Sequence, residues 1–143
     1  MLTIDTDDFR LQVAPVSTHR EKPGGPYLEW IDVRIRLTEP GLQAERQWRV
    51  MPAELRNFQQ QLQSMQTQLR PAQRAELKGV EPGFALILRM LEQGAILGEW
   101  RFQPLPPDGA SITGFCGLDQ SFLPELLQGI ESLLAFPGTG NPA

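Results

Sequence analysis

The chain has very little of the side-chain chemistry that most enzymes and metalloproteins use. One histidine and one cysteine occur in 143 residues. A zinc site ordinarily takes three or four nitrogen or sulfur ligands, so one copy of this chain cannot assemble such a site. A phosphate-binding glycine loop is also missing, because Gly24-Gly25 is followed by Pro26 and not by the start of a helix. We therefore expect no metal, no cofactor and no catalytic residues.

The lone histidine and the lone cysteine have structural explanations. His19 lies in the stretch 17–26, where two prolines and two glycines without an apolar period predict a loop. Cys116 lies within a predicted strand, where burial keeps a thiol protonated and unreactive. We expect neither residue to act in catalysis.

The acidic residues do not form a recognisable cation or catalytic motif. Asp5, Asp7 and Asp8 lack the glycine and the closing glutamate of a calcium loop. The spacing of Glu76 and Glu81 is equally compatible with solvated surface. These carboxylates predict turns and surface positions.

The charge balance and the short apolar runs exclude further classes of partner. Lys and Arg number 13 against 17 Asp and Glu, a net charge of −4, which is the wrong sign for binding phosphates over a wide footprint. No apolar run approaches the roughly 20 residues that a bilayer crossing needs. With no signal-peptide pattern at the N-terminus and no second cysteine for a disulfide, we expect a cytoplasmic protein without nucleic-acid or membrane partners.

Length and hydrophobic periodicity indicate a single α+β domain over residues 1–137, followed by a flexible C-terminal tail at 138–143. Apolar and polar residues alternate most clearly from Leu28 to Leu37 and from Leu42 to Val50, and Pro40-Gly41 between them predicts a hairpin. Further strands are expected at 2–4, at 9–13 ending before Pro15, at 74–78, 84–90, 96–103 and 112–118. The predicted fold is one antiparallel β-sheet of about five to seven strands.

Two amphipathic helices complete this prediction. One begins at Pro52, carries an apolar stripe from Leu55 to Leu69, and ends before Pro71. The other begins near Asp119 or Ser121 and ends at Phe136-Pro137. We expect both to pack on one face of the sheet.

One feature of the predicted sheet suggests a binding surface. Trp30 shares strand parity with Arg34 and Arg36 on a face that is otherwise solvated, and tryptophan and arginine are enriched among the residues that dominate protein interfaces. Glu99 and Arg101 occupy the solvated parity of another strand. We assign these five residues to partner binding, with packing of Trp30 under the long loop or against the N-terminal strand as the alternative. Trp48 and Trp100 are on apolar parities and are expected in the core.

The C-terminal segment carries a family resemblance. Leu118-Asp119-Gln120-Ser121-Phe122-Leu123-Pro124, continuing to Phe136-Pro137, resembles the strand-to-helix junction of the WapI-type bacterial immunity proteins. A weaker likeness extends over residues 28–137. The resemblance implies an α+β fold and a non-enzymatic protein that binds and neutralises a cognate toxin domain in a toxin–antitoxin pair.

Two other functions stay open at this point. One is a small enzyme or ligand-binding domain with an acidic or arginine-lined cleft between sheet and helices. The other is a structural subunit of a larger complex. The sequence does not indicate the oligomeric state.

Overall fold

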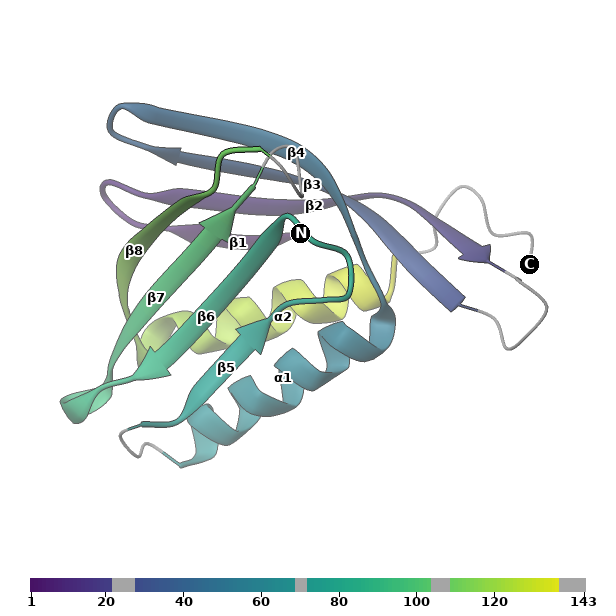
Figure 1. Cartoon of the computed structure of the whole chain (residues 1–143). Coiled ribbons are helices and arrows are strands. Elements are labelled where there is room, and N and C mark those ends of the chain that lie inside the picture. Colours follow the sequence, from purple (N-terminus) through teal and green to yellow (C-terminus); the bar gives the residue numbers. More distant parts are fainter. Residues whose placement is uncertain (22–27, 69–71, 104–108, 137–143) are drawn as a thin grey trace.

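The computed structural model describes residues 1–21, 28–68, 72–103 and 109–136, and its strands form two sheets (Figure 1). Both sheets are antiparallel and have four strands each, and the described residues also form two α-helices and two short 3-10 helices, η1 and η2. The first sheet has the order β1 (Leu2–Asp5), β2 (Arg10–Glu21), β3 (Leu28–Glu39), β4 (Leu42–Val50); the second has β5 (Arg74–Leu77), β6 (Phe84–Met90), β7 (Ala95–Phe102), β8 (Ile112–Asp119). The remaining elements are α1 (Pro52–Thr67), η1 (Glu92–Gly94), η2 (Gln120–Phe122) and α2 (Leu123–Leu134).

The α+β class is confirmed, but the prediction of one sheet is wrong. A period of two in the sequence reports that a strand is half buried and not which strand it pairs with. Helix α1 separates β4 from β5, and β5 pairs with β6 to begin the second sheet. Each sheet is therefore formed by four strands that are consecutive in the chain, and each strand pairs antiparallel with the next.

The two sheets pack their apolar faces against one another. Phe9, just before β2, stacks on Trp100 of β7 with ring centroids 6.2 Å apart. Trp48 of β4 meets Phe84 of β6 edge to face at 5.3 Å. Both tryptophans are buried, as predicted, and one continuous hydrophobic cluster joins the sheets and both helices.

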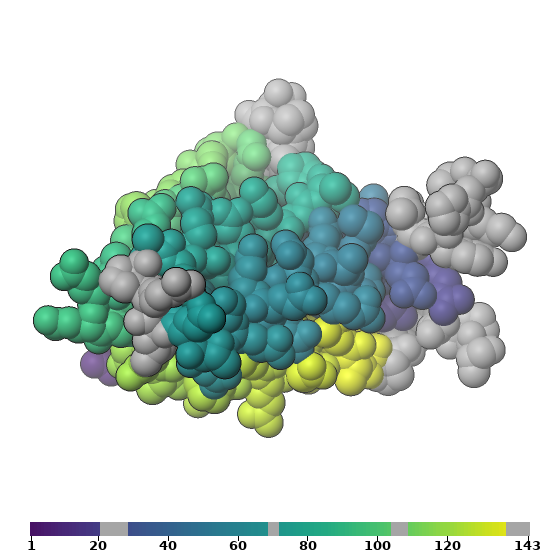
Figure 2. Space-filling view, turned by 90° about the horizontal axis from the view of Figure 1, so that it is seen from below, coloured from purple at the N-terminus to yellow at the C-terminus, as the bar shows by residue number. Residues whose placement is uncertain are grey.

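The helices cover one edge of each sheet. In α2, Gly129 allows a close approach to the first sheet, because a Cβ there would lie 2.9 Å from the backbone of Met1 and Leu2. In α1, the Gln61 side chain accepts a hydrogen bond from the backbone N–H of Glu76 on β5, at 2.8 Å. The two helices lie side by side on the surface seen in Figure 2, where α1 is blue and α2 is green to yellow.

Strand β2 is longer than predicted. We expected it to end at Pro15, since proline cannot donate to a sheet, but a bulge shifts the register between Pro15 and Ser17 and pairing continues to Glu21. His19 is consequently in a strand, in register with Trp30. The rest of the predicted loop, residues 22–26, lies outside the described residues, as do Leu69, residues 104–108 and the predicted tail at 138–143.

Candidate functional site

The five predicted contact residues lie on two different faces of the molecule. Trp30, Arg34 and Arg36 are on the outer face of β3 in the first sheet, whereas Glu99 and Arg101 are on the outer face of β7 in the second. Because the sheets share a core between their inner faces, their outer faces point away from each other. The structure brings together the members of each group but not the two groups.

The Trp30 side chain is buried although it lies on the outer face of β3. Its exposed fraction is 5%, and the guanidinium carbon of Arg49 on β4 lies 4.6 Å from the ring centroid. This is a cation–π arrangement, in which the guanidinium group lies over the face of the ring. Trp30 therefore positions Arg49, and the ring itself offers little surface to a partner.

Arg34 and Arg36 present positive charge to solvent beside this tryptophan. Their side chains are 42% and 57% exposed, and both reach Glu45 on β4, with N–O distances of 3.2 and 3.4 Å. One carboxylate thus balances two guanidinium groups. Arg49 in turn lies 3.3 Å from a carboxylate oxygen of Glu81, so each arginine of this face has an acidic neighbour.

A polar cluster that the sequence did not reveal adjoins Trp30. Oδ2 of Asp32 accepts the Ser17 hydroxyl at 3.0 Å, and Nδ1 of His19 lies 2.8 Å from the same oxygen. A serine–histidine–aspartate relay needs the imidazole between hydroxyl and carboxylate. Here both groups converge on one carboxylate oxygen, so the cluster fixes β2 to β3 without activating the serine. The missed signal was the continuation of β2 beyond Pro15, which places Ser17 and His19 beside Asp32.

The outer face of the second sheet has an aromatic side chain next to Glu99 and Arg101, which form an ion pair. Arg101 and Glu99 are 2.8 Å apart in β7, and Phe115 of β8 is in register with Glu99. Phe115 is 60% exposed, which is high for a phenylalanine in a strand. Its parity, opposite to that of the buried Cys116, would have placed it on this face.

Burial also explains the chemistry of the only cysteine. The Sγ of Cys116 faces the core, and burial raises the pKa of this thiol to about 11, with a smaller contribution from the negative charge of Glu39. A thiol with such a pKa is almost fully protonated at neutral pH. The predicted packing role of Cys116 is confirmed by its burial.

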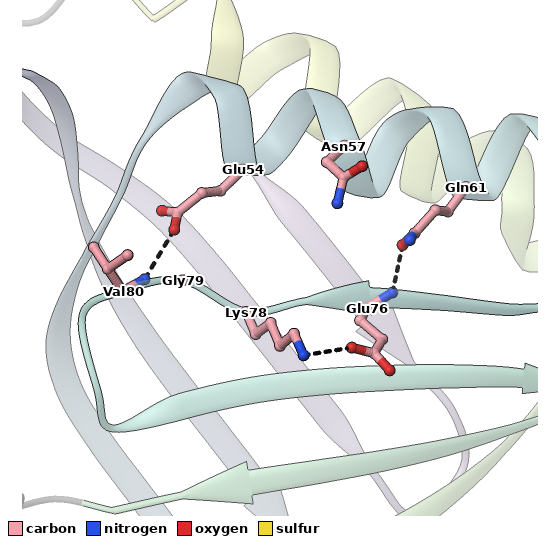
Figure 3. Close-up of a pocket in the computed structure, with 7 residues that line it drawn as sticks. All are labelled: Glu54, Asn57, Gln61, Glu76, Lys78, Gly79 and Val80. Atoms are coloured by element: carbon pink, nitrogen blue, oxygen red, sulfur yellow. Dashed lines mark hydrogen bonds and ion pairs between the residues drawn. The ribbon is translucent and has the colours of Figure 1, made fainter.

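A hollow of about 450 Å³ lies between α1 and β5 (Figure 3). The Glu54 carboxylate accepts the backbone N–H groups of Met51 and Val80, each at 2.8 Å, which caps α1 and fixes the chain after β5. Residues lining the hollow are Glu54, Asn57, Gln61, Glu76, Lys78, Gly79 and Val80.

The charges in this hollow are paired with one another. Glu76 lies 3.0 Å from Lys78 and 2.6 Å from Arg74, and the hydrogen bond from Lys78, followed by the two positive charges, lowers the pKa of Glu76 below its usual value. Because Glu54 is occupied by backbone donors, neither carboxylate points unpartnered into the space. The residues that line the hollow thus hold α1 against β5 and the segment that follows it.

Two further features are absent from the part of the chain that the structure describes. No three of its histidine, cysteine, aspartate or glutamate side chains are grouped as they would be around a metal ion. None of its helices combines the length and the apolar character that crossing a bilayer requires.

Comparison with known proteins gives a family. No match to an individual curated protein was found. A family model, the immunity protein WapI-like family, matches residues 1–137, which is more of the chain than the predicted likeness over 28–137 and includes β1 and β2. The chain therefore belongs to the WapI-like immunity protein family.

Proposed function

We propose that this chain is a non-enzymatic immunity protein that binds one cognate toxin domain in the bacterial cytoplasm and neutralises it by occupying its surface. The observation that carries this proposal is the family match over residues 1–137, which includes every element of the fold. The paired state of the polar groups supports it. Asp32, Glu54 and Glu76 all hold partners within the chain, as expected of groups that stabilise a binding scaffold.

The outer face of the first sheet is the proposed contact. It presents Arg34 and Arg36 on a long central strand, with Arg49 held over Trp30, and rigid arginine groups of this kind are frequent energetic centres of interfaces. The exposed guanidinium groups of Arg34 and Arg36, which share one carboxylate, suit an acidic patch on the toxin. Glu99 and Arg101 on the opposite face are the alternative contact, and they neutralise each other.

The test is growth rescue on co-expression with a toxin encoded next to this chain. Wild-type protein should restore growth, and the double variant Arg34→Glu/Arg36→Glu should fail to do so. Reversing two contact charges should weaken binding by at least about tenfold, which corresponds to about 1.4 kcal/mol.

Arg101→Glu is the matched control for this variant. It reverses one half-exposed arginine of an ion pair on the outer face of the other sheet, which is half the charge change of the double variant. Rescue by Arg101→Glu together with failure of the double variant supports the first sheet as the contact. The opposite pattern assigns the contact to the second sheet, and absence of rescue by the wild-type chain from any neighbouring toxin contradicts the proposed function.

A further inference from the structure

The two sheets have four edge strands, and the helices cover only two of them. Helix α2 lies along β1, and α1 lies along β5, so two edges are covered (Figure 1). Within the described residues, no helix or strand pairs with the outer edge of β4 or of β8. An uncovered edge presents unpaired backbone N–H and C=O groups that can template another strand.

Strand β4 carries the features that usually prevent such pairing. Glu45, Arg46 and Arg49 place charges along it, and an incoming strand would have to desolvate them. Arg46 also leaves the first sheet and donates from Nη1 to the backbone carbonyl of Gln103 at 2.6 Å. The edge of β4 is thus protected by charge and by a side chain that crosses it.

Strand β8 has fewer of these features, since its one charged residue is Asp119 at its end. From Ile112 to Leu118 it has no charged residue and no proline, and it has small residues at Gly114 and Gly117. The exposed ring of Phe115 stands at its centre. An edge that no described strand or helix covers, with an exposed aromatic ring at its centre and a charge only at its end, is a combination that soluble proteins usually avoid unless another strand covers it.

We propose that β8 pairs antiparallel with β8 of a second copy of this chain, about a two-fold axis at Phe115, to give one eight-stranded sheet across the dimer. Antiparallel pairing about this axis places opposite each other two residues that lie equally far before and after position 115. The resulting pairs are Phe115 with Phe115, Gly114 with Cys116, Thr113 with Gly117, Ile112 with Leu118, and Ser111 with Asp119.

The composition of these pairs identifies a second copy as the occupant. The only charge, Asp119, faces a serine, so no like charges oppose each other. On the inner side, Leu118 meets Ile112 and extends the core, while on the outer side the two exposed Phe115 rings cover each other. The same segment therefore complements itself, which is the requirement of a two-fold interface.

A register centred on Cys116 would also place inner-face residues opposite inner-face residues. This register is less favourable. It opposes Leu118 with Gly114 and each Phe115 with Gly117, so less apolar surface is covered. The dimer proposed here involves an edge, whereas toxin contact is assigned to a sheet face, and the two proposals do not depend on each other.

Sedimentation velocity over a wide range of protein concentration tests the dimer. The wild-type chain should associate to dimers, and Phe115→Lys should raise the dimer dissociation constant by more than about a hundredfold, because two rings lose their cover and two ammonium groups then face each other. Val80→Lys is the matched control, since Val80 is a 70% exposed apolar residue away from β8, and it should dimerise as the wild type does.

Amide hydrogen exchange gives a second readout that needs no substitution. The alternate amides of 112–118 that point away from β7 should exchange more slowly as the wild-type concentration rises, while those of β4 stay unchanged. If Phe115→Lys folds poorly, Thr113→Lys on the same exposed face replaces it. A chain that is monomeric at all concentrations, or a dimer that neither lysine variant weakens, overturns the proposal.

Discussion

Gly114 gives the sharpest test of how the second sheet is packed. A Cβ at this position would lie 2.1 Å from Cζ2 and 2.5 Å from Cε2 of the Trp100 ring, far inside van der Waals contact. The ring cannot easily move away, because Trp100 is 1% exposed and stacks on Phe9. Gly114→Ala therefore forces the aromatic contact between the two sheets apart.

The expected magnitude follows from comparison with Gly117 on the same strand. Overpacking a close-packed core typically costs about 1–3 kcal/mol, and this is the loss expected for Gly114→Ala. A Cβ at Gly117 meets nothing within 4 Å, so Gly117→Ala should instead stabilise by about 0.4–1 kcal/mol by restricting the unfolded chain. The two single-methyl substitutions should thus differ by about 1.5–4 kcal/mol in free energy of unfolding.

Urea denaturation followed by circular dichroism measures this difference. The two variants should show midpoints on opposite sides of the wild-type value with similar denaturant dependence. Equal free energies of unfolding for Gly114→Ala and Gly117→Ala would refute the reasoning, because the same residue change in one strand would then be insensitive to the Trp100 ring.

Two further predictions concern the helix brace and the buried thiol. Glu54→Ala should lower the free energy of unfolding by about 1–3 kcal/mol, because the backbone N–H groups of Met51 and Val80 lose their acceptor. Asn57→Ala, in the same hollow, should have little effect. Equal losses of stability in chemical denaturation would contradict this role of Glu54. Because burial raises the pKa of Cys116, the unfolded chain ionises first as pH rises, so the stabilisation is complete below the ordinary thiol value near 9.0 and is lost up to about pH 11. The free energy of unfolding should fall more steeply over that interval in the wild type than in Cys116→Ala, and parallel pH profiles would show that the thiol is not buried.

Much of the fold could be predicted because its elements have strong local patterns. Strands β3 and β4 and helix α1 follow clear apolar periods, and Gly41, with a φ of +81°, lies in the turn between β3 and β4. The division into two sheets has no local signal, since it depends on which strand β5 pairs with. The extension of β2 was missed because a bulge at Pro15 restores a pairing that proline would otherwise end.

The strand face of each candidate residue was predictable from the sequence, but the arrangement of these residues in space was not. Parity correctly put Trp30, Arg34 and Arg36 on one face of β3, because alternation fixes the side of a strand. Parity cannot report that Arg49 covers Trp30, or that Glu99 and Arg101 belong to another sheet, because both depend on contacts between distant segments. The exposed Phe115 was missed because its significance comes from the uncovered edge of β8.

Affinity purification of the tagged chain from its native host, followed by mass spectrometry, tests the proposed immunity function most directly. The account predicts one stoichiometric protein partner that carries a toxin domain, recovered with the wild type and with Arg101→Glu and lost with Arg34→Glu/Arg36→Glu. Recovery of the chain without any protein partner, or as a fixed subunit of a large complex without a toxin, would contradict it.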